Sequence, residues 1–530
     1  MKIILKHNKS FKWYTNHTIF FIGYFYVDDV FYEKENALNY LLKIKTNTEL
    51  KAFFTMSNGV FTILKKEKNS LLITVDITRS FPVFYTHYKD ELVVSDDIFN
   101  LKNNSNLNDF NVCSEIELKA ANHTFGRKTL IENIYQVQAS ECLKIDQKTI
   151  LKSSFTYSYA IKKESVSDYK TLKTTAINAF ENSFKRLILS VQNRTLVIPL
   201  SGGFDSRLIA TILKKHNYKN VVCYTYGKKD SFEIENSKKT AQLLDFKWHF
   251  IEYNEHLIHG FLDSEEFKNY AHYAGKLSSM PNFQEYFAVK YLKENNLIRN
   301  DAIFVPGYAG DILGGSEYLK SIPIKINHSE LADSILEKKM TNYHFTKQEK
   351  NQLKLEIENN LSTYNEFYHQ KIPETVLDDH NIKERIAKYI FNSASFYTFF
   401  GYEFRFPFWD KDLLDFFKTV PVQFKINKTL FDDVLINHYF KPFNVYFENE
   451  LHPIPQKKWI QKIKRQLKPF LPTFIKEKKV SDNDWNNYKI ITEKMLTFLK
   501  NKGVKVHRTY NDYNEIITQW YIYISKNGFD

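Results

Sequence analysis

Apolar runs of strand length follow one another closely through the first 150 residues. Each run is rich in Ile, Val, Leu, Phe or Tyr, and polar segments such as the lysine-rich residues 65–70 separate them. The runs cover residues 19–26, 59–64, 71–75, 83–88 and 91–95. Several short strands at this spacing, joined by polar turns, predict a β-rich first domain with a sandwich architecture.

The pattern changes to alternating helices and strands after a polar connector at residues 150–166. Ser167-Asp168 is a suitable helix N-cap, and apolar residues follow it at helical spacing to about residue 189. Buried strands are then predicted at residues 196–200, 221–227 and 248–251. This alternation predicts a doubly wound parallel sheet with ligands at the carboxyl ends of its strands. We expect three parts, residues 1–150, 167–470 and 471–530, the last a helical extension.

The composition fits a folded protein of the cytoplasm. The chain has 530 residues, 43% of them apolar and 25% charged, with a formal net charge of +13. Its three cysteines suit neither a disulfide framework nor a metal site, and no apolar run is long enough to span a membrane. A solvated helix face explains the basic residues 460–478 better than nucleic-acid binding. We therefore expect no nucleic-acid or membrane partner, and we leave a homodimer open.

The segment Ser-Gly-Gly-Phe-Asp-Ser, residues 201–206, joins a predicted buried strand to a predicted helix. Backbone N–H groups and the helix dipole converge on such a turn and favour an anion, and its glycines let a phosphate approach the backbone. No Gly-Lys-Ser/Thr follows, so the turn lacks the lysine of a P-loop. Asp205 suggests that Mg²⁺, shared with phosphate oxygens, supplies the positive charge. An ordinary small-residue turn is the alternative.

This turn resembles the pyrophosphate loop of the ATP pyrophosphatase superfamily, whose members activate an acyl group as an adenylate and release pyrophosphate. A second glycine turn with an acid, at residues 303–315, resembles the corresponding segment of asparagine synthetases. The resemblance places Asp311 on the second magnesium-binding aspartate and Gly307 beside the adenylate. It implies ATP and Mg²⁺ as cofactors, with the metal held by Asp205 and Asp311. A helix N-cap role for Asp311 is the alternative.

The same resemblance implies the nucleotide contacts and the fold. The superfamily holds pyrophosphate on the glycine turn and adenine on the backbone of the next strand. Carried onto this sequence, the contacts are Leu200, Ser201, Gly202, Gly203, Asp205, Ser206, Thr225, Tyr226 and Gly307. The implied fold is an α+β, Ntn-like β-sandwich domain followed by an α/β ATP pyrophosphatase domain, a doubly wound parallel sheet with a helical C-terminal part.

The first domain resembles the class II glutamine amidotransferase domain of asparagine synthetases in its strand order and in segments 58–61 and 76–85. It departs from the family at the glutaminase residues. Lys2 follows Met1, so the N-terminal cysteine nucleophile is missing, and no arginine precedes Arg79 to hold the glutamine carboxylate. We expect no glutamine hydrolysis, so nitrogen would come from ammonia or from an amine.

Tyr308 stands where asparagine synthetases have a glutamate, and in this the chain is similar to β-lactam synthetases. There a tyrosine with a glutamate partner deprotonates an amine, and a lysine stabilises the oxyanion. A tyrosine needs such help because its reference pKa is about 10. Glu384 is the candidate partner, and Lys457 or Lys458 is the candidate lysine. A packed aromatic residue, an exposed helix glutamate and surface lysines are the respective alternatives.

We therefore expect an asparagine-synthase-like, ATP-dependent carbon–nitrogen ligase that forms an amide and releases AMP and pyrophosphate. Its substrates would be a small-molecule or peptide carboxylate and ammonia or an amine. One alternative, which Tyr308 favours, is a β-lactam-synthetase-like or lasso-cyclase-like enzyme that closes a ring or joins two substrates. The others are a tRNA-modifying enzyme of the superfamily, which would need further cysteines or an RNA-binding appendage, and a non-catalytic relative.

Overall fold

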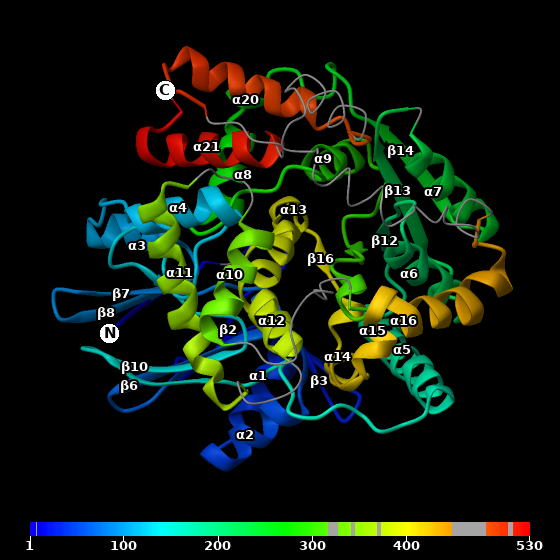
Figure 1. Ribbon diagram of the computed structural model, residues 1–530, viewed down its shortest axis with the longest axis horizontal. Coiled ribbons are helices and arrows are strands. Elements are labelled where there is room, and N and C mark those ends of the chain that lie inside the picture. Colours follow the sequence, from blue (N-terminus) through cyan, green and yellow to red (C-terminus); the bar gives the residue numbers. More distant parts are fainter. Residues whose placement is uncertain are drawn as a thin grey trace.

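The computed structural model has the β-sheets of the N-terminal part on one side and a parallel sheet with helices on the other (Figure 1). The structure describes residues 1–6, 8–229, 231–315, 327–340, 345–367, 373–447, 484–506 and 512–529. Within these ranges, every helix is too short or too polar to cross a membrane.

The predicted N-terminal strands are present and form two sheets. The larger, antiparallel sheet runs in the order β11 (Ile150–Phe155), β10 (Glu141–Asp146), β6 (Ser70–Val75), β5 (Asn58–Lys66), β3 (Ile19–Val27) and β2 (Tyr14–Thr15), with β4 (Val30–Glu33) also paired to β3. The smaller sheet runs in the order β1 (Lys2–Ile4), β8 (Glu91–Ser95), β7 (Phe84–Tyr88) and β9 (Tyr135–Gln136). All five apolar runs correspond to strands, and the larger sheet continues past residue 150 to Phe155.

Strand β3 is buried on both faces, which explains its nearly continuous apolar sequence. Phe21 and Phe25 face one hydrophobic cluster, and Ile22 and Tyr24, on the opposite face, belong to the main core. The helices of this part are α1 (Lys34–Leu42), α2 (Asn47–Met56), α3 (Ile98–Ser105) and α4 (Val112–Ala121). Helices α1 and α2 complete the cluster that Phe21 and Phe25 face. Helices as well as the smaller sheet therefore cover the larger sheet.

A third sheet, which follows the N-terminal part, is parallel throughout and confirms the predicted α/β arrangement. Its order is β14 (Lys247–Glu252), β13 (Val221–Gly227), β12 (Leu196–Pro199), β15 (Ile303–Phe304) and β16 (Glu403–Phe404). The chain runs from β12 outward to β13 and β14, then returns to the other side of β12 to form β15 and β16. The strand order therefore reverses beside β12, where a crevice opens at the carboxyl edge of such sheets.

Helices surround this sheet and fill the space between the two parts. Helix α5 begins where the sequence predicts, because the Asp168 carboxylate accepts the Thr171 N–H at 2.8 Å. The α-helices from here to the middle of the chain are α5 (Tyr169–Val191), α6 (Phe204–Lys215), α7 (Phe232–Leu243), α8 (Glu265–Gly275), α9 (Tyr286–Glu294), α10 (His328–Lys339) and α11 (Lys347–Leu361). Those that follow are α12 (Pro373–Asn381), α13 (Ser395–Phe400), α14 (Lys411–Thr419), α15 (Val422–Lys425), α16 (Thr429–Val434), α20 (Lys489–Asn501) and α21 (Asp512–Asn527).

Charged side chains join the N-terminal part to the parallel sheet. Arg186 on α5 makes two 2.7 Å hydrogen bonds to Asp410 and a third to Asp29, which lies between β3 and β4. Arg405 stacks on the Tyr24 ring and forms an ion pair with Glu403 at 3.1 Å. Both parts therefore share a continuous core.

The C-terminal segment contains the helices α20 and α21, whose buried residues belong to the main core. Trp520 and Tyr521 on α21 are fully buried, and α21 contacts both α4 and α8. The Tyr521 hydroxyl accepts the Leu277 N–H at 2.9 Å. Gly275 leaves room for this ring, because a Cβ there would lie 2.1 Å from the Tyr521 Cζ atom. Helices α20 and α21 therefore complete the protein's core (Figure 1, top).

Replacing Gly275 with alanine tests this contact. We expect Gly275→Ala to push the Tyr521 ring out of place and to lower the free energy of unfolding by about 1–3 kcal/mol, as overpacking does. In a Tyr521→Ala background the same substitution should cost nothing, because the ring that it meets is gone. Thermal melts of the four variants in this cycle measure the effect. An equal loss in both backgrounds would contradict the packing described.

Candidate active site

The Ser201–Ser206 segment comprises the end of the loop after β12 and the first residues of α6. The Ser201 N–H donates to the Ser206 Oγ at 3.0 Å, and the Gly203 N–H donates to the Ser201 Oγ at 3.2 Å. Gly203 is the N-cap residue of α6 and provides no side chain to cap the helix. The buried Arg207 guanidinium donates to the Gly202 carbonyl. The loop therefore presents the N-terminus of α6 to a neighbouring anion.

A carboxylate already accepts one N–H of the turn. The Gly202 N–H donates to the Glu233 carboxylate, which comes from the first turn of α7. Gly202 does not line the adjacent cavity, whereas Ser201, Gly203, Asp205 and Ser206 do. The contact shows that the Gly202 N–H donates to an anionic group.

Asp205 and Asp311 meet above this turn, at the point where the strand order reverses. The Asp311 N–H donates to the Asp205 carboxylate at 3.1 Å. Glycines allow this approach, since a Cβ on Gly307 or on Gly310 would come within 3.0 Å of Asp205 atoms. Both aspartates line a cavity of about 500 Å³ that also has Gly307 in its wall. The structure thus brings together the two acids and the glycine turn that the sequence singles out.

The electrostatics of this cavity favour a cation. Burial and the neighbouring Asp311 carboxylate raise the pKa of Asp205 to about 7. Asp432 is a third acid in the lining, and its buried Oδ1 accepts no hydrogen bond. No group of three or more His, Cys, Asp or Glu has metal-binding geometry in the described ranges. Two carboxylates still fit Mg²⁺, because this ion usually retains waters and phosphate oxygens beside one or two protein ligands.

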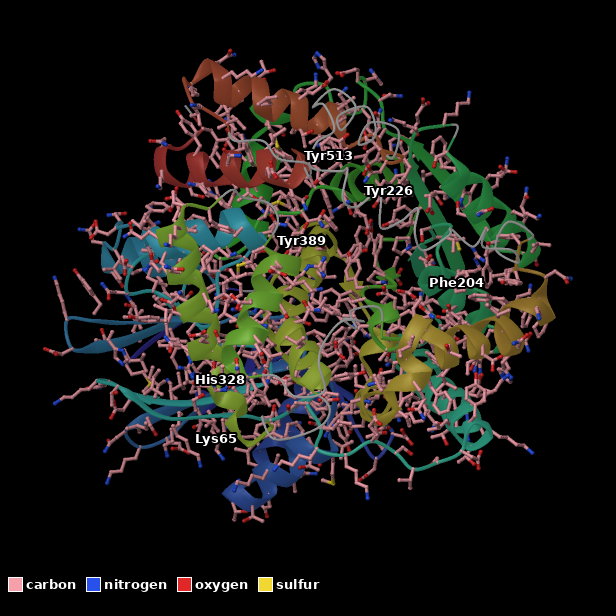
Figure 2. All side chains as sticks on the ribbon, viewed as in Figure 1. Lys65, Phe204, Tyr226, His328, Tyr389 and Tyr513 are labelled. Atoms are coloured by element: carbon pink, nitrogen blue, oxygen red, sulfur yellow. The ribbon has the colours of Figure 1, made fainter. Side chains whose placement is uncertain are left out.

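The other predicted nucleotide residues lie along the same cavity. Leu200, Thr225 and Tyr226 line it together with Trp485, and Phe204 and Tyr226 lie on the same side of the molecule (Figure 2). The Thr225 hydroxyl is used within the fold, since it donates to the Leu200 carbonyl at 2.6 Å. This end of the cavity is aromatic and suits a flat base.

Tyr308 lines the cavity, and Glu285 is its acidic partner. The Tyr308 hydroxyl lies 3.2 Å from that of Tyr397, which donates to Glu285 at 2.8 Å. Tyr224 also donates to this carboxylate. Burial raises the pKa of Glu285, although hydrogen bonds from Tyr224, Tyr397 and Tyr308 oppose the effect. Burial and Glu285 hold the pKa of Tyr308 well above its usual value.

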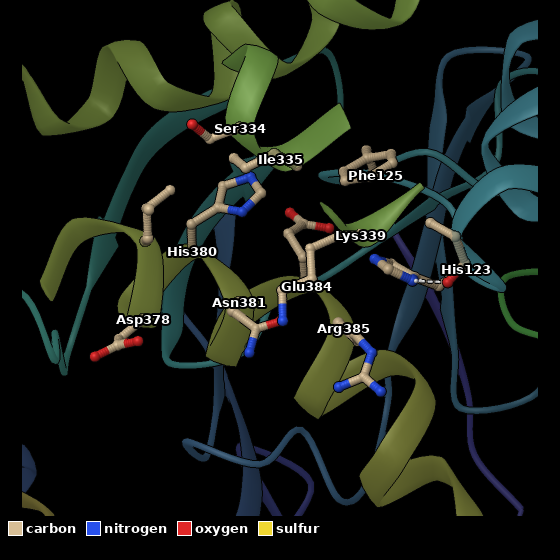
Figure 3. A pocket seen from close by; sticks show the side chains of 12 residues that line it. His123, Phe125, Ser334, Ile335, Lys339, Asp378, His380, Asn381, Glu384 and Arg385 are labelled. Carbon is tan, nitrogen blue, oxygen red and sulfur yellow. Dashed lines mark hydrogen bonds between the residues drawn. The ribbon is translucent and has the colours of Figure 1, made fainter. Parts of the chain in front are cut away.

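The structure does not bring Glu384 to Tyr308, which corrects the predicted pairing. Glu384 is buried elsewhere, where it accepts the Gly126 N–H at 3.1 Å and the Lys388 ammonium at 2.6 Å. Figure 3 shows it among His123, His380 and other residues that line a different and much smaller pocket. The physical reason is its i,i+4 pairing with Lys388, which holds the carboxylate against the N-terminal part.

Lys457 and Lys458 lie outside the described residues, and a different lysine lines the cavity. Lys428 forms an ion pair with Asp432 at 3.7 Å, and its charge lowers the pKa of Asp205. Sequence reasoning missed both Lys428 and Glu285. The available signal for Glu285 was that it is the lone acid in the aromatic-rich segment 277–292. No motif pointed to Lys428.

Comparison with known proteins gives no family. No protein-family model matches the chain, and no curated protein matches its sequence. Several solved structures resemble parts of it. An NH3-dependent NAD synthetase from Campylobacter jejuni is 16% identical over 43% of this chain and 96% of its own, with a TM-score of 0.22. An NMN synthetase from Francisella tularensis is 12% identical over 41% of this chain and 92% of its own, with a TM-score of 0.20.

A third similar structure is a glutamine phosphoribosylpyrophosphate amidotransferase from B. subtilis. It is 11% identical over 57% of this chain and has a TM-score of 0.18. The match spans 59% of the amidotransferase. Likenesses at these identities and TM-scores carry no argument about function, which therefore rests on the site itself.

Removing the Asp205 charge tests the electrostatics of the site. The pKa of Asp205 is about 7 in the folded protein, against about 4 for an unfolded carboxyl. Between these pH values the folded protein holds a proton on Asp205 that the unfolded chain has lost. The contribution of this carboxyl to the free energy of unfolding therefore decreases as the pH rises from 4 through 7. Without divalent ions, Asp205→Asn should melt above the wild type at pH 8, and the gain should disappear toward pH 4.

A matched control is Asp245→Asn, at a 95% exposed aspartate in a left-handed position that asparagine tolerates. It should show no pH-dependent gain. Added Mg²⁺ should raise the melting temperature of the wild type and of this control, but not that of Asp205→Asn. Equal Mg²⁺ shifts in all three proteins would contradict a metal site at Asp205.

Proposed function

We propose that this chain is an ATP-dependent ligase that activates a carboxylate as an acyl-adenylate and transfers the acyl group to a nitrogen nucleophile. The observation that best supports this is the meeting of Asp205 and Asp311 above the glycine turn, at the reversal point of a parallel sheet. The sequence resemblance to asparagine synthetases points to the same chemistry. The products would be an amide, AMP and pyrophosphate.

In the first step a substrate carboxylate oxygen attacks the α-phosphorus of ATP. The bond from that phosphorus to the bridging oxygen breaks, and pyrophosphate leaves. The N-terminus of α6, whose N-cap residue Gly203 lines the cavity, would attract the departing phosphates. Asp205 and Asp311 would hold Mg²⁺, which supplies positive charge to the phosphate oxygens. Lys428 adds a second positive charge on the cavity wall.

In the second step the nitrogen attacks the acyl carbon, and AMP leaves. The nitrogen loses a proton to the Tyr308 oxygen while the Tyr308 proton passes to Glu285. This relay needs no free tyrosinate, which suits a tyrosine whose pKa is well above its usual value. The raised pKa of Glu285 makes its carboxylate a better base than an ordinary glutamate.

A second candidate differs only in its nucleophile. Here the nitrogen belongs to a substrate amine instead of free ammonia, and either nitrogen loses one proton on forming the amide, so the Tyr308–Glu285 arrangement serves both. The amine is suggested by Tyr308, where the sequence resembles the β-lactam synthetases. Such an enzyme would close a ring or join two substrates, as lasso-peptide cyclases also do. Product analysis with amine and ammonia donors separates the two candidates.

Isotope exchange between pyrophosphate and ATP tests the first step. We expect exchange that depends on Mg²⁺ and on a carboxylate found by screening, and that is abolished in Asp205→Ala. The control Asp245→Ala, at an exposed position, should retain it. Exchange that persists in Asp205→Ala would overturn the assigned site.

Tyr308→Phe should separate the two steps. The exchange rate should remain near that of the wild type, because the hydroxyl is not needed for adenylation. Amide formation should fall by about 10²-fold or more, the usual contribution of a general base. Tyr402→Phe is the matched control, since its buried hydroxyl has no hydrogen-bond partner. An equal loss in both assays would mean that Tyr308 only supports the structure.

A further inference from the structure

A second large cavity lies between the N-terminal part and the helices of the parallel-sheet part. Its volume is about 530 Å³, within the range of sites that bind small molecules. One wall comes from the segments around Arg79 and Asp96, and the other from α8, Lys276 and the segment from Phe391 to Phe399. None of its lining residues lines the cavity at Asp205.

Two cations in this cavity have no acidic partner. Arg79 is buried, and its guanidinium donates to the Val137 carbonyl at 3.0 Å and to the Gln136 side chain. The Lys276 ammonium donates to the Asn392 amide oxygen at 3.3 Å. Neither cation forms an ion pair with a described residue. Burial and the Arg79 charge lower the pKa of Lys276 to about 7, although the Asp96 and Asp97 carboxylates oppose the shift.

The nearby carboxylates are engaged elsewhere. Asp96 accepts the Lys6 N–H at 2.9 Å and the Trp13 indole N–H at 2.8 Å. Asp97 pairs with the Lys6 ammonium at 2.6 Å and caps α3. Asp76 and Glu384 act on Arg79 only at longer range, and each is held by its own hydrogen bonds. An added anion would therefore meet Lys276 and Arg79 without displacing an existing ion pair.

The rest of the wall is largely aromatic. Trp13, Phe81, Phe99, Tyr273, Phe399 and Phe404 contribute rings to the lining. These side chains suit a flat or apolar group and exclude a strongly hydrated one. The cavity thus combines buried positive charge with an apolar surface.

We propose that this cavity binds an organic acid whose carboxylate lies between Lys276 and Arg79 and whose aromatic or apolar body packs against the surrounding rings. A carboxylate offers two acceptor oxygens, which match the donors of a guanidinium and an ammonium. A free inorganic anion would leave the aromatic wall unfilled. An amine of the same shape would meet uncompensated positive charge.

This site goes beyond the proposed function but is structurally connected to it. The helical segment that presents Phe391 and Thr398 to the cavity also carries Tyr397, which bonds to Glu285 beside Tyr308. The Phe391 ring also packs edge-on against Tyr308, with 6.0 Å between centroids. The proposed acid site therefore shares a helical segment with the residues that surround Tyr308.

The test uses three probes of one shape on the full-length protein without nucleotide: a fluorinated phenylpropanoate, the corresponding alcohol and the corresponding amine. Fluorine NMR titrations report binding of each probe. We expect the carboxylate to bind and the amine not to bind, with the alcohol at least tenfold weaker than the carboxylate. Equal binding of all three, or no binding of the carboxylate, would overturn the proposal. ATP is absent, so this outcome is independent of adenylation.

Variants at Lys276 test whether its ammonium group binds the carboxylate of the probe. Lys276→Met should weaken carboxylate binding by roughly tenfold, the loss of one charge-assisted hydrogen bond, and Lys276→Arg should restore it. Lys268→Met is the control, because Lys268 lies on α8 but outside the cavity. Wild-type affinity in Lys276→Met would place the anion elsewhere. Should Lys276→Met not fold, the comparison of the three probes on the wild type still decides the question.

Discussion

Two carboxylates held close together in a buried crevice are the constraint on which this structure depends. Asp205 and Asp311 come from turns that follow neighbouring strands, and burial makes their mutual repulsion costly. The chain offsets part of that cost without a metal, since the Asp311 N–H donates to Asp205 and Lys428 lies in the same cavity. The glycines at 307 and 310 permit the same closeness, because a Cβ at either would lie 3.0 Å from an Asp205 atom. At Gly310 a Cβ would also meet the Phe408 ring at 2.7 Å.

The framework of this site could be predicted because its signals are local. A buried strand, a small-residue turn and an amphipathic helix are encoded in consecutive residues, and the alternation of strands and helices then fixes a parallel sheet. The α5 N-cap and the five N-terminal strands were predictable for the same reason. Strands β15 and β16 have two residues each, too few for a periodic pattern. The covering of β3 by helices on one face depended on packing between distant segments.

The chemistry within the framework was less predictable, because it depends on which distant side chains meet. A Glu-x-x-x-Lys spacing such as Glu384–Lys388 is typical of an exposed helix pair. Here it is buried, since the Gly126 N–H donates to Glu384 and the Thr124 and Gly126 carbonyls accept from Lys388 in place of water. Glu285, in contrast, has no partner at a local spacing. Three tyrosines from separate segments donate hydrogen bonds to it. Motifs identify the glycine turns and their acids, whereas the partners of Tyr308 come from tertiary packing.

The fold gives the N-terminal part a direct connection to the candidate site. Its Gly126 N–H binds Glu384 within the π-helical turn at Ile382–Ile390. That turn leads directly to Phe391, whose ring packs against Tyr308. The Arg186–Asp29 ion pair and the stacking of Arg405 on the Tyr24 ring join the two parts. The N-terminal part therefore forms one side of the scaffold that positions Tyr308, because its contact with Glu384 fixes the helical segment that leads to Phe391.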